Sequence, residues 1–197
     1  MVKSVKSSET TGSGPRAAEL VSALNGEWAK KREYNLNGLK KFESAQAILK
    51  SDPQVQIAVA KYIIESICGI AKREQARGRR DWFTARDFPW GAAYFLSSHL
   101  KRRLPIGEET LIEMFGQVAD VGFISASQFE FLGSLVSALE RHAAKESLSP
   151  KLRKVIESVL INLIGKGTCH RLWEADAADR YVVARIERIL AEPLDLN

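Results

Sequence analysis

The sequence predicts an all-α protein, and three features of the chain lead to this prediction. Apolar residues recur every three or four positions almost wherever proline and glycine are missing, as in helices that bury one face. No segment alternates apolar and polar residues as a half-buried strand does, and the Asn-Gly pairs lie among helical spacings. Eight helices joined by short links would place the helix content far above the usual third.

The segment after Pro150 gives the clearest helical pattern. Ser149 is expected to cap this helix, and Pro150 to take the first helical position, where a missing N–H is no loss. Basic and acidic residues occupy the opposite face. The apolar residues that follow the i, i+3, i+4, i+7 spacing are Leu152, Val155, Ile156, Val159, Leu160, Leu163 and Ile164.

The same spacing, together with terminal signals, places the other helices. A capping box at Ser125 and Gln128 predicts a helix start, and Glu108 and Glu109 suit the positive end of another helix dipole. The segment that begins at Pro53 is apolar nearly all round, so we expect it at the centre of the fold. The predicted helices are a segment from about residue 15, then 36–50, 53–77, 90–103, 107–120, 125–146, 150–165 and a final segment around 182–190.

Composition indicates a cytoplasmic globular chain. Hydrophobic residues make up 45% and charged residues 27%, and no apolar run approaches the roughly 20 residues that cross a bilayer. The first fourteen residues are polar and lack the apolar stretch of a signal peptide. Cys68 and Cys169 stand far apart, which favours a reducing compartment. We expect one helical domain over 15–192, a disordered tail over 1–14 and a short tail over 193–197.

Neighbouring helices group into pairs joined by short links that mostly contain proline. The pairs are 36–50 with 53–77, 90–103 with 107–120, and 125–146 with 150–165, and like helices are separated by roughly 36 residues, close to the period of two-helix repeats. Over residues 36–190 this pattern resembles HEAT and armadillo-type helical-repeat proteins. The resemblance implies antiparallel helix pairs stacked as a short right-handed solenoid. A compact irregular helical bundle is the alternative.

Two stretches carry a second resemblance. The segments PWGAAYFLSSHLKRRLPIGEETLIEMF and LSPKLRKVIESVL are similar to helical regions of large bacterial proteins of the molybdate-metabolism-regulator type. This resemblance implies that the chain is a fragment or a short relative of a longer protein. It implies no site residues, because neither stretch contains a motif of known chemistry.

No residue pattern marks a catalytic, metal or cofactor site. His99, His142 and His170 are isolated, without the spacing of a divalent metal site. The first two lie near predicted helix C-termini, where a positive imidazole suits the helix dipole, so a structural role is favoured. Cys169 adjoins His170, but side chains at neighbouring helical positions diverge, which argues against a reactive thiol. Cys68 lies within an apolar helix and is expected in the core.

The strongest local anomaly is a basic run with aromatic neighbours around residues 72–86. Its members are Lys72, Arg73, Arg77, Arg79, Arg80, Trp82 and Arg86. Side chains of these kinds contact phosphates and stack on bases. The structural alternative is that the cations complement the helix dipole and that the aromatic residues cover a helix junction. Other basic groups, Lys101-Arg102-Arg103 among them, are interpreted as solvated helix ends.

These observations favour a non-catalytic helical-repeat scaffold that binds another protein. The alternative is a nucleic-acid-binding solenoid that uses the basic run, and the net charge of +5 permits either acidic partner. A helical-repeat DNA glycosylase would place a tryptophan and a carboxylate beside a damaged base, but no wider sequence pattern supports it. The candidate pairs are Trp82 with Asp87, and Trp173 with Glu174 or Asp176. A regulatory or structural segment of a larger enzyme is the remaining hypothesis.

Overall fold

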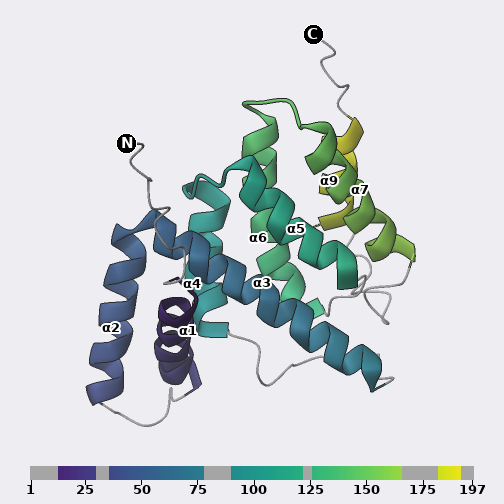
Figure 1. Ribbon diagram of the computed structural model, residues 1–197. Helices are drawn as coiled ribbons and strands as arrows, with labels where there is room; N and C mark the ends of the chain where they lie inside the picture. The colour runs from purple at the N-terminus through teal and green to yellow at the C-terminus, as the bar shows by residue number, and fades with distance from the viewer. Residues whose placement is uncertain (1–12, 30–35, 78–89, 122–125, 166–181, 192–197) are drawn as a thin grey trace, which may run out of the picture.

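A computed structural model describes residues 13–29, 36–77, 90–121, 126–165 and 182–191, and within these ranges every regular element is a helix (Figure 1). The predicted all-α class is therefore confirmed. The helices are α1 (Ser13–Ala29), α2 (Leu36–Ser51), α3 (Pro53–Ala76), α4 (Trp90–Arg102), α5 (Glu108–Val121), α6 (Ala126–Ala143), α7 (Pro150–Gly165) and α9 (Ala184–Ala191).

Two helix starts show why the sequence predicted these bounds so closely. A carboxylate oxygen of Asp52 accepts hydrogen bonds from the N–H groups of Gln54 (2.9 Å) and Val55 (3.2 Å), which caps α3. The hydroxyl of Ser149 accepts one from the N–H of Leu152 at 3.2 Å and caps α7, as expected. Both caps are local interactions. The predicted capping box at residues 125–128 begins outside the described residues, and α6 ends at Ala143, slightly before the expected end.

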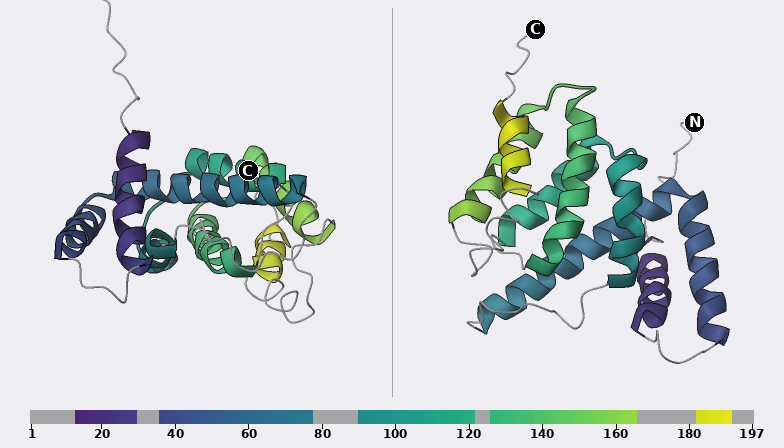
Figure 2. Two further views of the ribbon diagram at one scale, coloured as in Figure 1. Left: turned by 90° about the horizontal axis from the view of Figure 1, so that it is seen from below. Right: turned by 180° about the vertical axis from the view of Figure 1, so that it is seen from behind.

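The helices from α3 onward pack in two layers. Along one layer α3 contacts α5 and α5 contacts α7, while in the other α4 contacts α6 and α6 contacts α9. The left view of Figure 2 shows α3 and α5 on one side and α4, α6 and α9 on the other. At the N-terminal end, α1 lies between α2 and α4 and also contacts α3. Each helix from α3 to α5 therefore packs against the helix two places further along the chain.

One edge of the molecule, uppermost in Figure 1, carries the short turns between paired helices. Asp52 alone separates α2 from α3, and segments 103–107 and 144–149 join α4 to α5 and α6 to α7. These three turns are the links that the sequence pairing predicted. The spacing of the pairs is uneven, because the start of α2 at Leu36 lies further from Trp90 than Trp90 lies from Ala126. The expected terminal tails lie outside the described residues, apart from Ser13 and Gly14, which begin α1.

A single hydrophobic cluster contains buried residues from every described helix. Helix α3 lies at its centre, and Val59, Ile63 and Ile67 are fully buried. By length and composition alone, α3 over Pro53–Arg73 is the one described helix that would suffice to cross a membrane, but half of its apolar stretch is buried inside the fold. A core helix has the same composition, which agrees with the central position that the sequence predicted.

Side-chain donors from neighbouring helices satisfy the backbone carbonyl groups at several helix C-termini. The carboxamide of buried Gln56 in α3 donates to the carbonyl of Leu49 near the end of α2. Asn162 of α7 donates to Ala119 near the end of α5, and Arg153 of α7 donates to the carbonyl of Leu190 near the end of α9. The last carbonyl groups of a helix have no partner within that helix, so these contacts fix the ends of neighbouring helices relative to one another.

Candidate binding surfaces

The predicted basic run is only partly within the described residues. Lys72, Arg73 and Arg77 are exposed at the C-terminal end of α3, as a phosphate-binding surface would require. The other members, Arg79, Arg80, Trp82 and Arg86, lie outside the described residues, as do Cys169 and His170. The structure therefore brings three of the seven predicted residues together on one helix end.

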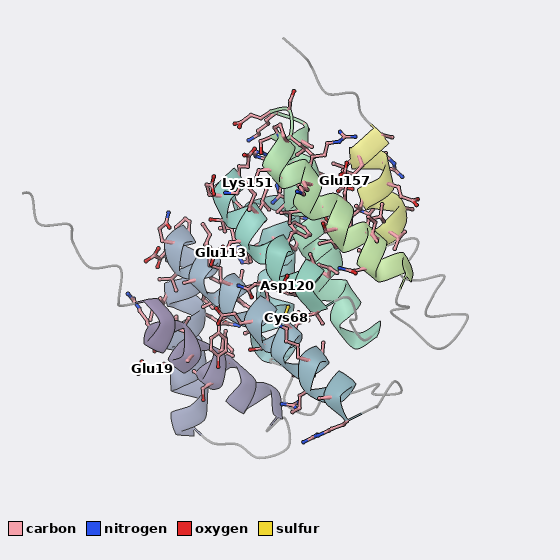
Figure 3. The ribbon with its side chains drawn as sticks, turned by 45° about the vertical axis from the view of Figure 1, so that its right-hand side comes forward. Glu19, Cys68, Glu113, Asp120, Lys151 and Glu157 are labelled. Carbon is pink, nitrogen blue, oxygen red and sulfur yellow. The ribbon has the colours of Figure 1, made fainter. Side chains whose placement is uncertain are left out.

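Cys68 lies in the interface between α3 and α5, as expected for a core cysteine. Its thiol donates to the carbonyl of Gln117 at 3.4 Å. Burial raises the pKa of the thiol to about 12; the nearby Lys72 charge lowers it, and the charges of Asp120 and Glu65 raise it further. Figure 3 shows Cys68 and Asp120 side by side along the boundary between the two helices. A thiol with so high a pKa is a poor nucleophile, and Cys68 is buried among the core residues, as the sequence predicted.

His142 lies beside Glu108, where the ends of α5, α6 and α7 meet. Its side chain is only 9% exposed, and its Nε2 atom lies 3.5 Å from Oε2 of Glu108 but forms no hydrogen bond among the described residues. The same carboxylate accepts a hydrogen bond from the N–H of Ser149 at 3.4 Å. Hydrogen bonds from Ser149, foremost that of its side chain, lower the pKa of Glu108 against the opposing effect of burial, and His142 lowers it further. Glu108 thus links the start of α7 to α5 and lies beside the buried His142 of α6.

Two cations on the α3–α5–α7 face lie beside carboxylates of a neighbouring helix. Lys61 of α3 pairs with Glu113 of α5, and Lys151 of α7 pairs with Glu109 of α5 at 3.3 Å. Glu113 and Lys151 are labelled on this face in Figure 3. Each pair joins two neighbouring helices of the layer. The charges of these four residues therefore neutralise one another locally.

A different arrangement occurs where α2 and α4 end. Lys50, Lys101, Arg102 and Arg103 are all exposed, and none of them forms an ion pair with another residue in the described ranges. The turns that follow α2 and α4 lie on the same edge of the molecule (Figure 1), so the two helix ends face the same way. Burial lowers the pKa of the half-buried His99, and the charges of Arg103 and then of Lys50 lower it further. We call these five residues the α4-end cluster.

Capping of α4 does not explain the α4-end cluster, because another residue performs it. The guanidinium group of Arg141 in α6 donates to the carbonyls of Leu100 and Lys101 and, at 3.1 Å, to that of Leu104. The N–H groups of Arg103 and Leu104 both donate to the carbonyl of His99 at 2.9 Å. The negative end of the α4 dipole is thus already compensated by Arg141. The interpretation of Lys101-Arg102-Arg103 as an ordinary solvated helix end is therefore incomplete.

The sequence showed only one part of the α4-end cluster. Three consecutive basic residues at 101–103 are visible as a run. Lys50, however, lies in α2, and the whole of α3 separates it from α4 in the sequence. Its proximity to His99 results from the packing of α2 and α4 around α1, which no local pattern encodes.

Among the described residues, no three His, Cys, Asp or Glu side chains lie close enough together to hold a metal ion. Comparisons of the chain with protein families, with curated proteins and with solved structures each find no match. The function is therefore inferred from the geometry of the described helices and their surface charges.

Proposed function

We propose that this chain is a non-catalytic helical-repeat scaffold of the HEAT or armadillo kind that binds another protein. The observation that supports this most directly is the packing order, in which α4 contacts α6 and α5 contacts α7. Stacked helix pairs place like helices against like helices in this way. Repeat arrays tolerate links of unequal length, so the uneven spacing of the pairs is compatible with the proposal.

The outer end of the α3–α5–α7 layer supports a protein partner. Helix α7 contacts α5 and α9, and it carries Ile161, the one large hydrophobic side chain that is exposed among the described residues, at 68%. A lone exposed isoleucine is ordinary by itself. At the end of a stacked layer, however, it lies where a partner would extend the packing.

Affinity capture from the source cell, quantified by mass spectrometry, tests the scaffold proposal. We expect a protein partner that is recovered reproducibly with the wild-type chain and not with an unrelated helical protein of equal net charge. Ile161→Asp should lower this recovery without changing thermal stability, and Lys154→Gln is the control because it alters the charge equally at an exposed position of the same helix. The absence of any reproducible partner would contradict the proposal.

The second candidate function is nucleic-acid binding by the basic run at residues 72–86. The exposure of Lys72, Arg73 and Arg77 on the end of α3 favours it. Binding to unrelated DNA and RNA should then weaken steeply as salt rises, because bound phosphates release counterions. Changing Arg77, Arg79 and Arg80 to alanine should weaken binding while the helix content stays the same. No binding at low salt would exclude this candidate.

A further inference from the structure

We infer that the α4-end cluster is the docking site for an acidic segment of the partner protein, a stretch rich in Asp and Glu. This inference rests on the proposed scaffold function and specifies where and by what chemistry the partner is bound. The supporting observation is that the ends of α2 and α4 carry four exposed cations. None of the four has an ion-pair partner among the described residues.

The cluster retains its charge for a ligand because its structural demands are met elsewhere. Arg141 satisfies the carbonyl groups at the end of α4, so Lys101, Arg102 and Arg103 are not needed as caps. On the α3–α5–α7 face, by contrast, Lys61 and Lys151 are held by carboxylates of the neighbouring helix. Unpaired cations that repel one another are unfavourable in the free protein and become favourable when an anion binds.

The C-terminal part of α4 carries groups that suit carboxylate side chains. The rings of Phe95 and His99 lie in contact, with centroids 5.4 Å apart, and both residues are half-buried. Residues 95, 99 and 102 follow a spacing that places them on one face of α4. Arg102 on this face, and Arg103, whose charge acts on His99, offer planar donors that bind a carboxylate through two hydrogen bonds.

The extent of the cluster favours an acidic protein segment over nucleic acid. The cluster supplies four permanent charges, fewer than the about six to ten phosphate contacts that make nucleic-acid binding steeply salt-dependent. A short acidic segment matches a surface of this size.

Three charge-matched double variants test the inference, and each removes one lysine and one arginine. The two cluster variants are K101Q/R102Q and K50Q/R103Q. The control variant is K154Q/R188Q, which changes exposed cations of α7 and α9 that form no ion pair among the described residues. The probe is a fluorescein-labelled octaglutamate peptide, and its binding to the full chain is followed by fluorescence anisotropy at low salt. All six positions are exposed, so the thermal midpoints of the variants should match that of the wild type.

We expect either cluster variant to weaken octaglutamate binding by roughly tenfold, and the control variant by less than about twofold. An equal loss in all three variants would show a response to net charge alone and would overturn the inference, as would the failure of the wild type to bind the peptide. Tighter binding of a twelve-residue oligothymidylate through the same residues would overturn it in favour of a phosphate ligand. Because the test uses purified protein and a defined peptide, its failure leaves the capture of a partner by another surface unaffected.

Discussion

The α3–α5–α7 face and the α4-end cluster contain the same kinds of charged residue in opposite arrangements. On the face, Lys61 and Lys151 lie against Glu113 and Glu109 of the neighbouring helix. At the end of α4, Lys101, Arg102 and Arg103 have no such partners in the described ranges, and Lys50 of α2 adds a further positive charge. The two regions show that a modest net charge of +5 conceals a separation between cations that join helices and cations that remain available.

The largest expected effect concerns Arg141, which allows the cluster to remain unpaired. Arg141→Met should lower the free energy of unfolding by about 2–3 kcal/mol, because carbonyls at the end of α4 lose a charged donor. Urea denaturation followed by circular dichroism measures this loss. Arg102→Met is the matched control and should change stability by less than about 0.5 kcal/mol, because Arg102 is exposed. Equal losses in the two variants would mean that Arg141 is not the cap.

This contrast also separates what the sequence predicted from what it did not. The helix bounds and the caps at Asp52 and Ser149 were predictable, because apolar period and capping act within a few residues. The contact of Arg141 with Leu100 spans 41 residues, and nothing in the local pattern distinguishes Arg141 from an ordinary cation in a last helical turn. The stacking of α4 on α6 determines that contact, so it became evident only in the folded chain.

The same limit explains the two basic surfaces. The run at residues 72–86 was found because its members are adjacent in sequence, and three of them are exposed as expected. The α4-end cluster was missed because Lys50 and His99 approach each other only through the packing of α2, α1 and α4. A search for contiguous runs of charge therefore misses charged surfaces whose residues come from separate helix ends.

The next effect concerns the cap between α6 and α7. Ser149→Ala should cost about 1–2 kcal/mol at neutral pH, because α7 loses its N-cap and Glu108 loses a hydrogen-bond donor. The folded pKa of Glu108 lies below its ordinary value, so its stabilising contribution is present above about pH 4.3 and is lost as the pH falls towards the folded pKa. Thermal melts from pH 7 to pH 3 should show the gap between wild type and variant narrowing.

The control for this prediction is Ser158→Ala. The hydroxyl of Ser158 donates only to the carbonyl of Lys154 within α7, so its loss should leave stability nearly unchanged at every pH. A gap between Ser149→Ala and the wild type that stays constant down to pH 3 would contradict a role for the Glu108 carboxylate.

A smaller effect is expected from the ion pairs of the α3–α5–α7 face. A double-mutant cycle with Lys151→Gln and Glu109→Gln should give a coupling energy of about 0.2–0.5 kcal/mol, because both side chains are largely exposed. Urea denaturation at low salt and again at about 1 M salt measures it, and screening should remove most of the coupling. A coupling that survives high salt would mean that the face is joined by more than charge.

The smallest change in stability, within about 0.5 kcal/mol, is expected when the α4-end cluster loses a charge at Arg103. Arg103→Gln should nevertheless raise the pKa of His99, because the positive charge of Arg103 disfavours the protonated imidazole. A proton NMR titration of His99 measures this shift, and Arg188→Gln on α9 is the control that should leave it unchanged.

Because the folded pKa of His99 lies below its unfolded value, the folded state loses stability as the pH falls below about 6.5, and the variant should lose less. Part of the depression should persist in the variant, since burial is its largest cause and the Lys50 charge remains. If the His99 titration is the same in wild type and Arg103→Gln, the charge of Arg103 does not reach His99, and the two residues do not share one positive surface.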